Sequence, residues 1–262
     1  MTDAHLHNLN DKQLEAVLAI DGPVLIVAGA GAGKTKTLTH RMFHLIKKGV
    51  SPGNILAITF TNKAAREMKE RIQRLLEAGG RKLETGSVWA GTFHSLGASI
   101  LRKHFRLAGL PRNFSILDED DSLNLIKESL KILEIDPKQF QPSRLLKIIS
   151  LKKGEAKNLD DFKKENKGEF FPSKIAEIWD GYENLLGKVG GADFDDLILK
   201  PIAIFKKYPK VLNEYQESWR YILIDEYQDT NFSQYLLGRI LAEKRRNICA
   251  IGDIDQSIYS FR

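Results

Sequence analysis

Short apolar runs recur along the chain and are separated by longer stretches with helical periodicity. The runs occupy residues 24–28, 55–59, 88–91, 221–224 and 248–251. Each run is too short for a buried helix and has the usual length of a buried strand. Between most of them apolar residues recur every three or four positions, which is typical of an amphipathic helix. This alternation predicts an α/β fold with a parallel, doubly wound sheet.

The alternation is interrupted between about residues 107 and 191, where helical periodicity continues without a convincing strand pattern. We therefore expect a mostly helical inserted subdomain at residues 107–191, with residues 1–106 and 192–262 forming the sheet domain. The periodic apolar positions of the insertion include Leu123, Ile126, Leu130 and Leu133.

Basic residues are concentrated in the insertion. Between Lys138 and Lys174 there are ten Lys or Arg against five Asp or Glu. Such an excess is typical of a nucleic-acid-binding face. A solvated helical surface with a flexible loop at residues 153–168 explains the same composition equally well, so composition does not decide between the two.

A glycine-rich segment, AGAGAGKT, follows the first apolar run and precedes a helical pattern. Such a turn lets backbone amides and the positive end of the helix approach phosphate groups. We expect the segment to bind ATP, with Lys34 reaching the terminal phosphates and the Thr35 hydroxyl completing the shell of a Mg²⁺ ion. The segment consists of Ala28, Gly29, Ala30, Gly31, Ala32, Gly33, Lys34 and Thr35.

Two adjacent acids, Asp225 and Glu226, follow the apolar run at 221–224. Carboxylates at the end of a parallel strand face the ligand site of such a sheet. Asp225 can bind Mg²⁺ through water, and Glu226 can take a proton from the water that attacks the last phosphate. In isolation the pair would more simply be two solvated acids at a strand end. Together with the glycine-rich segment it predicts ATP hydrolysis.

Composition narrows the class of protein. The 262 residues carry a formal net charge of +6, which weakly favours an anionic partner. No apolar run is long enough to cross a bilayer, and residues 1–10 lack the apolar stretch of a signal peptide. We therefore expect a cytoplasmic setting. The only cysteine, Cys249, lies in an apolar run, so a disulfide scaffold and a cysteine-rich metal site are excluded.

Six segments of the chain carry a resemblance to a known family. They are LNDKQ at 9–13, TFTNKAAREM at 59–68, GTFHS at 91–95, DFDDLI at 193–198, DEYQDTN at 225–231 and GDIDQSIYSFR at 252–262. Together they closely resemble the UvrD/PcrA/Rep family of superfamily 1 DNA helicases, whose phosphate loop often begins with alanine. The resemblance implies a RecA-like P-loop NTPase fold and translocation on single-stranded DNA, typically 3′ to 5′, driven by ATP hydrolysis.

The resemblance assigns roles around the nucleotide. It places Gln13 at the adenine edge, where the paired donor and acceptor of an amide fit. It gives Gln256 the role of sensing the terminal phosphate and coupling hydrolysis to movement. Gln228 and Asp229, in the acidic motif, are expected to link the nucleotide and DNA sites, although the sequence does not show which hydrogen bonds they make.

The resemblance also assigns DNA contacts. Phe60, Tyr259 and Phe261 match positions where aromatic rings stack on bases, which tolerates any base. Thr92 and His94 match a pair that contacts the phosphate backbone without reading sequence. Aromatic core packing and a helix-capping Thr are the ordinary alternatives at these positions. Asn62 and Lys63 open a predicted helix beside Phe60 and are candidates for a further phosphate contact.

The chain ends at Arg262, within the third motif of the family. We therefore expect it to be the N-terminal part of a helicase, very slow in hydrolysis without the arginines of a second lobe. Expected partners are single-stranded DNA, duplex junctions and repair or replication proteins, with no membrane. The alternatives are a DNA-binding or partner-docking module without ATP turnover, the N-terminal part of a helicase-nuclease, and a phosphotransferase or another P-loop ATPase.

Overall fold

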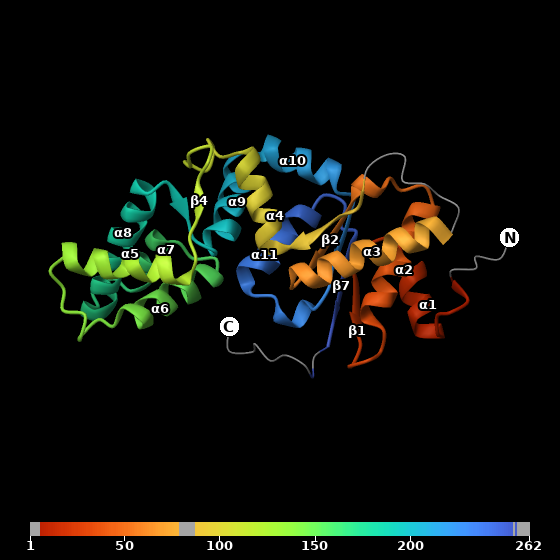
Figure 1. Ribbon diagram of the computed structural model, residues 1–262, viewed down its shortest axis with the longest axis horizontal. Helices are drawn as coiled ribbons and strands as arrows, with labels where there is room; N and C mark the ends of the chain where they lie inside the picture. The colour runs from red at the N-terminus through yellow and green to blue at the C-terminus, as the bar shows by residue number, and fades with distance from the viewer. Residues whose placement is uncertain (1–5, 79–86, 254, 256–262) are drawn as a thin grey trace. The chain divides into compact units, whose positions relative to one another are not determined.

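The computed structural model describes residues 6–78, 87–253 and 255. Its elements follow the predicted alternation of strands and helices (Figure 1). The described chain forms two compact units. The sheet unit comprises the described residues within Met1–Phe93, Tyr208–Thr230 and Gly238–Phe261, and the helical unit comprises His94–Lys207 and Asn231–Leu237. The predicted division at residues 107 and 191 stays a prediction.

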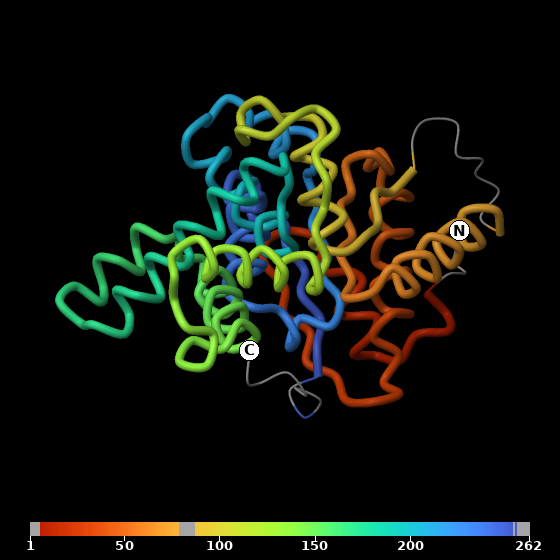
Figure 2. Tube along the Cα trace, turned by 60° about the vertical axis from the view of Figure 1, so that its left-hand side comes forward, coloured from red at the N-terminus to blue at the C-terminus, as the bar shows by residue number. Residues whose placement is uncertain are grey.

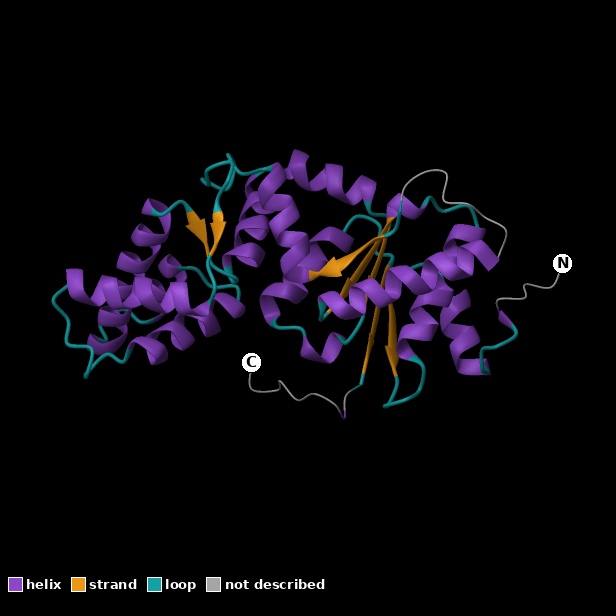
Figure 3. Ribbon diagram, in the orientation of Figure 1, coloured by secondary structure: helices purple, strands orange, loops and turns teal. Residues whose placement is uncertain are grey.

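The sheet unit contains a parallel sheet of five strands with the order β1-β7-β6-β2-β3 (Figure 3). Strands distant in sequence are neighbours, so the C-terminal β7 pairs with the N-terminal β1 (Figure 2). This confirms the predicted α/β fold with a parallel sheet. The strands are β1 (Val24–Val27), β2 (Ile55–Thr59), β3 (Trp89–Thr92), β6 (Tyr221–Ile224) and β7 (Ile248–Gly252).

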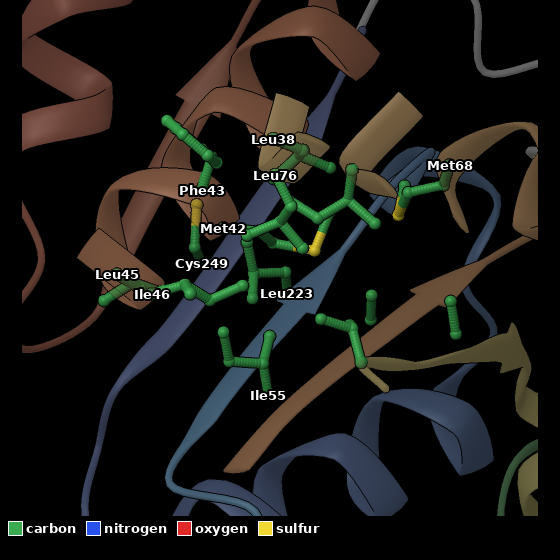
Figure 4. Packing of buried hydrophobic residues seen from close by; sticks show 14 of the residues in the cluster. Leu38, Met42, Phe43, Leu45, Ile46, Ile55, Met68, Leu76, Leu223 and Cys249 are labelled. Atoms are coloured by element: carbon green, nitrogen blue, oxygen red, sulfur yellow. The ribbon is translucent and has the colours of Figure 1, made fainter. Parts of the chain in front are cut away.

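One apolar core lies between this sheet and two of its helices (Figure 4). Helix α2 contributes Leu38 and Met42, α3 contributes Met68, and the strands contribute Ile55 and Leu223. All five residues of β2 are buried, as expected of a central parallel strand covered on both faces. The helices of this region are α1 (Asp11–Leu18), α2 (Lys34–Lys47), α3 (Asn62–Ala78) and α10 (Pro209–Ser218).

The helical unit has its own apolar core, built around Ile126, Trp179 and Tyr182. It contains α5 (Glu119–Ile132), α6 (Pro142–Gly154), α7 (Leu159–Glu165), α8 (Phe170–Lys188) and α9 (Asp196–Lys207). Helix α4 (Phe93–Lys103) begins at the boundary between the units, and α11 (Phe232–Ala242) has residues in both.

Two details of the insertion differ from the sequence-based expectation. A short parallel pair, β4 (Ser115–Ile116) and β5 (Gly191–Ala192), occurs where no strand is predicted. Two residues give too short a pattern to detect by alternation. The interpretation of residues 153–168 as a flexible loop is also wrong, because α7 occupies Leu159–Glu165 and Asn158 caps it through the backbone amide of Asp161.

Candidate nucleotide-binding site

The candidate site lies at the carboxyl ends of β1, β7 and β6, three adjacent strands of the parallel sheet. The glycine-rich loop follows β1, the acid pair follows β6, and Asp253 follows β7. Because β7 lies between β1 and β6, Asp253 is placed between the loop and the acids. The strand order therefore gathers three segments that are distant in sequence.

The phosphate loop has the backbone geometry that its glycines predict. Gly31 and Gly33 have φ angles of +72° and +81°, a left-handed conformation that side chains disfavour. Gly33 directly precedes the first residue of α2, so the loop ends at the positive end of that helix. Positions 29 and 31 face open space, with nothing within 4 Å of an added Cβ. A phosphate group can therefore approach the loop backbone closely.

Lys34 is the first residue of α2, and its ammonium group contacts residues that follow all three strands. Its Nζ lies 3.6 Å from Asp253 Oδ2 and 4.0 Å from Glu226 Oε2. It also donates a hydrogen bond of 3.4 Å to the carbonyl of Ala28. Only 10% of the Lys34 side chain is exposed, so contacts with these protein groups, more than with water, hold the ammonium group in position.

Asp225 is a buried carboxylate at the end of β6, with 5% of the residue exposed. Burial, followed by the charge of Glu226, raises its pKa to about 6. The opposing effects are a hydrogen bond from the Glu226 amide at 3.0 Å, the charge of Lys34 and a hydrogen bond with Thr35. Thr35 and Asp225 are therefore adjacent, as a shared metal site requires.

Glu226 has an unusual backbone for a residue with a side chain. Its φ and ψ angles are 50° and 46°, in the left-handed region. Its carboxylate accepts a hydrogen bond of 2.8 Å from Gln228 Nε2, and 38% of the side chain is exposed. The carboxylate is thus held by Gln228 and remains partly accessible to water.

Gln13 lies against the phosphate loop. Its Nε2 donates to the carbonyl of Ala32 at 2.9 Å, and its Oε1 accepts from the amide of Asn10 at 3.2 Å. Asn10 Oδ1 accepts in return from the Gln13 amide at 2.9 Å, which completes a capping box at the start of α1. Reading an adenine edge with this amide would require it to exchange one of these bonds.

The residues expected to contact DNA occupy strand and helix ends. Phe60 follows β2 and is 37% exposed, while Asn62 and Lys63 open α3 and are exposed. Thr92 is the last residue of β3 and is buried. His94, in α4, makes an edge-to-face contact with Phe194 at 5.6 Å between ring centroids. Tyr259 and Phe261, the other two expected stacking residues, lie outside the described residues, and so does Gln256, which is expected to sense the terminal phosphate.

Sequence reasoning missed Asp253 as a member of the site. Its signal is the same as that of Asp225, because both acids directly follow an apolar strand. What the sequence does not give is the adjacency of β7 to β1, which brings Asp253 to Lys34. Thr61 was also missed; its hydroxyl accepts from the Ala64 amide at 3.1 Å and caps α3.

The protein side chains alone do not form a complete metal site. Within the described residues, no group of three or more His, Cys, Asp or Glu side chains is arranged to hold a metal ion. A Mg²⁺ ion bound here would therefore need phosphate and water ligands besides Thr35 and Asp225, which is the usual arrangement for this ion.

None of the helices in the described part of the chain has the length and apolar character needed to span a membrane.

The parallel sheet, the phosphate loop after β1 and the acid pair after β6 define a RecA-like P-loop NTPase domain. Residues 9–262 match the family model of the UvrD/REP helicase N-terminal domain, and the chain belongs to this family.

Curated relatives agree with this assignment. The chain is 47% identical over 261 residues to "ATP-dependent DNA helicase PcrA" of Staphylococcus aureus (strain Mu50), covering 99% of the chain and 35% of the relative. It is 47% identical over 258 residues to the protein of the same name from Bacillus subtilis (strain 168), covering 98% and 34%. The chain thus spans about a third of the length of these relatives.

Proposed function

We propose that the chain is the N-terminal motor lobe of an ATP-dependent DNA helicase that binds ATP with Mg²⁺ and single-stranded DNA. Movement in the 3′ to 5′ direction and unwinding at duplex junctions belong to the longer protein. The proposal is supported by family membership and by the relatives' names. The single observation that carries it is the meeting of Lys34 with the carboxylates of Glu226 and Asp253 at adjacent strand ends.

In this proposal Lys34 leaves its carboxylate partners and neutralises the terminal phosphates of ATP, while the loop amides between Ala28 and Lys34 hold the phosphate chain. Thr35 and Asp225 hold Mg²⁺ together with phosphate oxygens. The donor set fits, because the buried carboxylate of Asp225 lies beside the hydroxyl of Thr35, and oxygen ligands of this kind suit the ion. When bound, the ion spreads the charge that develops on the transferring phosphoryl group.

Glu226 acts as the general base in this proposal. Its carboxylate is partly exposed and lies 4.0 Å from Lys34, so a water molecule near the last phosphate can reach it. Gln13 contacts the adenine edge, and Gln256 senses the terminal phosphate. The charge-neutralising arginines of a second lobe are expected outside this chain, so turnover by the chain alone is slow.

The DNA path is proposed to cross the ends of β2 and β3. Phe60, Tyr259 and Phe261 stack on bases, and Thr92 and His94 hold the phosphate backbone. Asn62 and Lys63 add contacts at the start of α3, where exposed polar groups can reach phosphates. Partners in repair or replication and a cytoplasmic setting are parts of the same proposal.

A nucleotide titration tests the ATP site. Lys34→Ala is expected to weaken binding of a fluorescent Mg-nucleotide at least about 10-fold, because a buried cation facing the phosphates is lost. Lys47→Ala is the matched control, since this lysine is exposed at the other end of the same helix. Equal, saturable affinity in Lys34→Ala and the parent would contradict the site.

Turnover separates the proposed motor from a binding module. Glu226→Gln keeps the size of the side chain but removes the base, so hydrolysis is expected to fall about 100-fold or more while nucleotide affinity is kept. Parent and variant are compared with and without single-stranded oligothymidine. Equal turnover in the two proteins would favour a module that binds DNA or a partner without hydrolysing ATP.

A further inference from the structure

Gln228 connects the ends of two neighbouring strands. It lies in the short 3₁₀ helix Tyr227–Asp229 that follows the acid pair of β6. Its Nε2 donates to Glu226 Oε2 at 2.8 Å, and its Oε1 accepts from the backbone amide of Asp253 at 3.0 Å. One side chain therefore bonds both the proposed base after β6 and the first residue after β7.

The two hydrogen bonds fix the orientation of the Gln228 amide. A backbone N–H can only donate, so the atom that faces Asp253 must be the amide oxygen. The NH₂ group then faces Glu226, where an ionised carboxylate can only accept. Among side chains of this length, a glutamate could accept from Asp253 but could not donate to Glu226. The amide oxygen and the NH₂ group of Gln228 thus bond two different residues, and only an amide can make both bonds.

Close packing keeps Gln228 in place. A Cβ atom added to Gly252 would lie 2.6 Å from Gln228 Oε1 and 3.2 Å from Gln228 N. Glycine at 252, the last residue of β7, therefore permits the 3₁₀ helix to lie directly against the strand end. This approach leaves the glutamine little freedom to change rotamer.

The contacts around Gln228 close a ring with the phosphate-loop lysine. From Glu226 the path runs through Gln228 to Asp253, from Asp253 to Lys34 over 3.6 Å, and from Lys34 back to Glu226 over 4.0 Å. A shift of any member changes the geometry of the next. The end of β7 is therefore tied to the position of the proposed base.

We propose that Gln228 is a positioning residue that sets the Glu226 carboxylate against the end of β7 and makes the placement of Asp253 depend on Glu226. This inference rests on the proposed ATP hydrolysis for its effect on rate. The link between Glu226 and Asp253 through Gln228 is independent of nucleotide and can be measured separately.

The activity test uses the full 262-residue chain with saturating Mg-ATP. Gln228→Met keeps the length of the side chain and removes both hydrogen bonds, so turnover is expected to fall about 10- to 100-fold. The dissociation constant of the nucleotide is expected to stay within about 3-fold, because Gln228 contacts the base rather than the phosphate loop. Gln228→Glu keeps the acceptor for Asp253 and is expected to lose turnover as well.

Gln216→Met is the matched control. Gln216 is a buried glutamine of the same unit, and its Nε2 donates to the carbonyl of Ile240 at 2.8 Å. Its loss costs a hydrogen bond of similar length away from the site, so turnover should equal that of the parent. Turnover of Gln228→Met within about 2-fold of the parent would overturn the positioning role.

A second readout does not depend on hydrolysis. In the parent, Glu226→Ala is expected to shift the amide NMR resonance of Asp253, because Gln228 transmits the change. In a Gln228→Met background the same substitution should shift that resonance much less, because only the contacts through Lys34 still join the two residues. A shift of equal size in both backgrounds would overturn the inference. A parent whose turnover does not depend on Glu226, but in which Gln228 transmits the shift, would contradict the proposed function alone.

Discussion

The ammonium group of Lys34 lies 3.6 Å from the carboxylate of Asp253, and both side chains are nearly buried. The two residues are 219 positions apart, and the pairing of β1 with β7 brings them together. A buried cation and anion in contact partly neutralise each other. Phosphate groups entering the loop must therefore compete with Asp253 for Lys34.

This competition predicts the effect of Asp253→Asn on metal-free nucleotide. The substitution removes a negative charge near the phosphates and frees Lys34, so ADP without Mg²⁺ should bind about 5-fold more tightly. Isothermal titration in EDTA measures the change. Glu243→Gln removes an exposed carboxylate of the same unit and should leave the affinity unchanged. Weaker binding by Asp253→Asn would show that Asp253 does not compete with phosphate.

The left-handed backbone of Glu226 predicts that glycine is more stable than alanine at this position. At φ 50° a residue with a Cβ atom is strained by about 1 kcal/mol relative to glycine. Glu226→Gly should therefore unfold at higher urea than Glu226→Ala, with a free energy of unfolding larger by about 1 kcal/mol. Both variants lack the carboxylate, so the comparison isolates the backbone. Equal stabilities would contradict the strain.

A second buried lysine stabilises the helical unit. Lys153 is 2% exposed, and its Nζ lies 2.7 Å from Asp193, 3.0 Å from Asp196 and 2.8 Å from Glu183. Tyr182 also donates to Asp193 at 2.8 Å. The nearby carboxylates keep the pKa of Lys153 well above its usual value despite burial. The lysine thus connects α6, α8 and the start of α9.

Lys153→Met should destabilise the chain by about 3 to 5 kcal/mol, because three carboxylates lose their shared cation. Lys152→Met is the control, since the neighbouring lysine is partly exposed and pairs with Glu155 at 3.0 Å; its loss should cost less than about 1 kcal/mol. Urea unfolding followed by circular dichroism compares them. Similar midpoints for the two variants would argue against a stabilising role of the buried cluster.

Asp195 makes the stability of the chain depend on pH. Burial, followed by the charge of Asp193, raises its pKa from 3.8 to about 7, with Asp196 adding to the rise and Ser150 and Lys153 opposing it. Between these pKa values the folded chain binds a proton that the unfolded chain does not. The contribution of Asp195 to the free energy of unfolding therefore falls as pH rises from about 4 to about 7.

An asparagine at this position removes the titration. Asp195→Asn should exceed the parent in free energy of unfolding by about 1 to 3 kcal/mol at pH 8 and match it at pH 4. Chemical denaturation across this range measures the difference. Asp160→Asn, at an exposed position of α7, should follow the parent curve. A constant offset between Asp195→Asn and the parent would rule out the titration as its cause.

Two helical glycines predict opposite effects of alanine. A Cβ atom on Gly97 in α4 would lie 1.7 Å from the carbonyl oxygen of Leu197 in α9, so Gly97→Ala should destabilise by at least about 2 kcal/mol. Gly187 in α8 has nothing within 4 Å, and Gly187→Ala should stabilise by about 0.5 to 1 kcal/mol. Thermal unfolding compares them, and the same sign of change in both would contradict this packing.

Local features of the site were predictable because they depend on neighbouring residues. The loop ending at Lys34 needs glycines at positive φ angles, and Asp225 directly follows a buried strand, so both can be identified without knowing the fold around them. The buried role of Lys153 was not predictable. Its basic neighbourhood resembles a solvated surface, and its carboxylate partners come from α8 and from the residues around the start of α9.

The sequence by itself therefore determined the alternation of strands and helices, the phosphate loop, the acid pair and the family. Only the tertiary structure decided that Asp253 faces Lys34, that Gln228 joins Glu226 to the end of β7, and which charges are buried. The reason is that strand order and helix packing bring together residues far apart in the chain, and the apolar runs of β1, β6 and β7 do not encode which strand lies beside which.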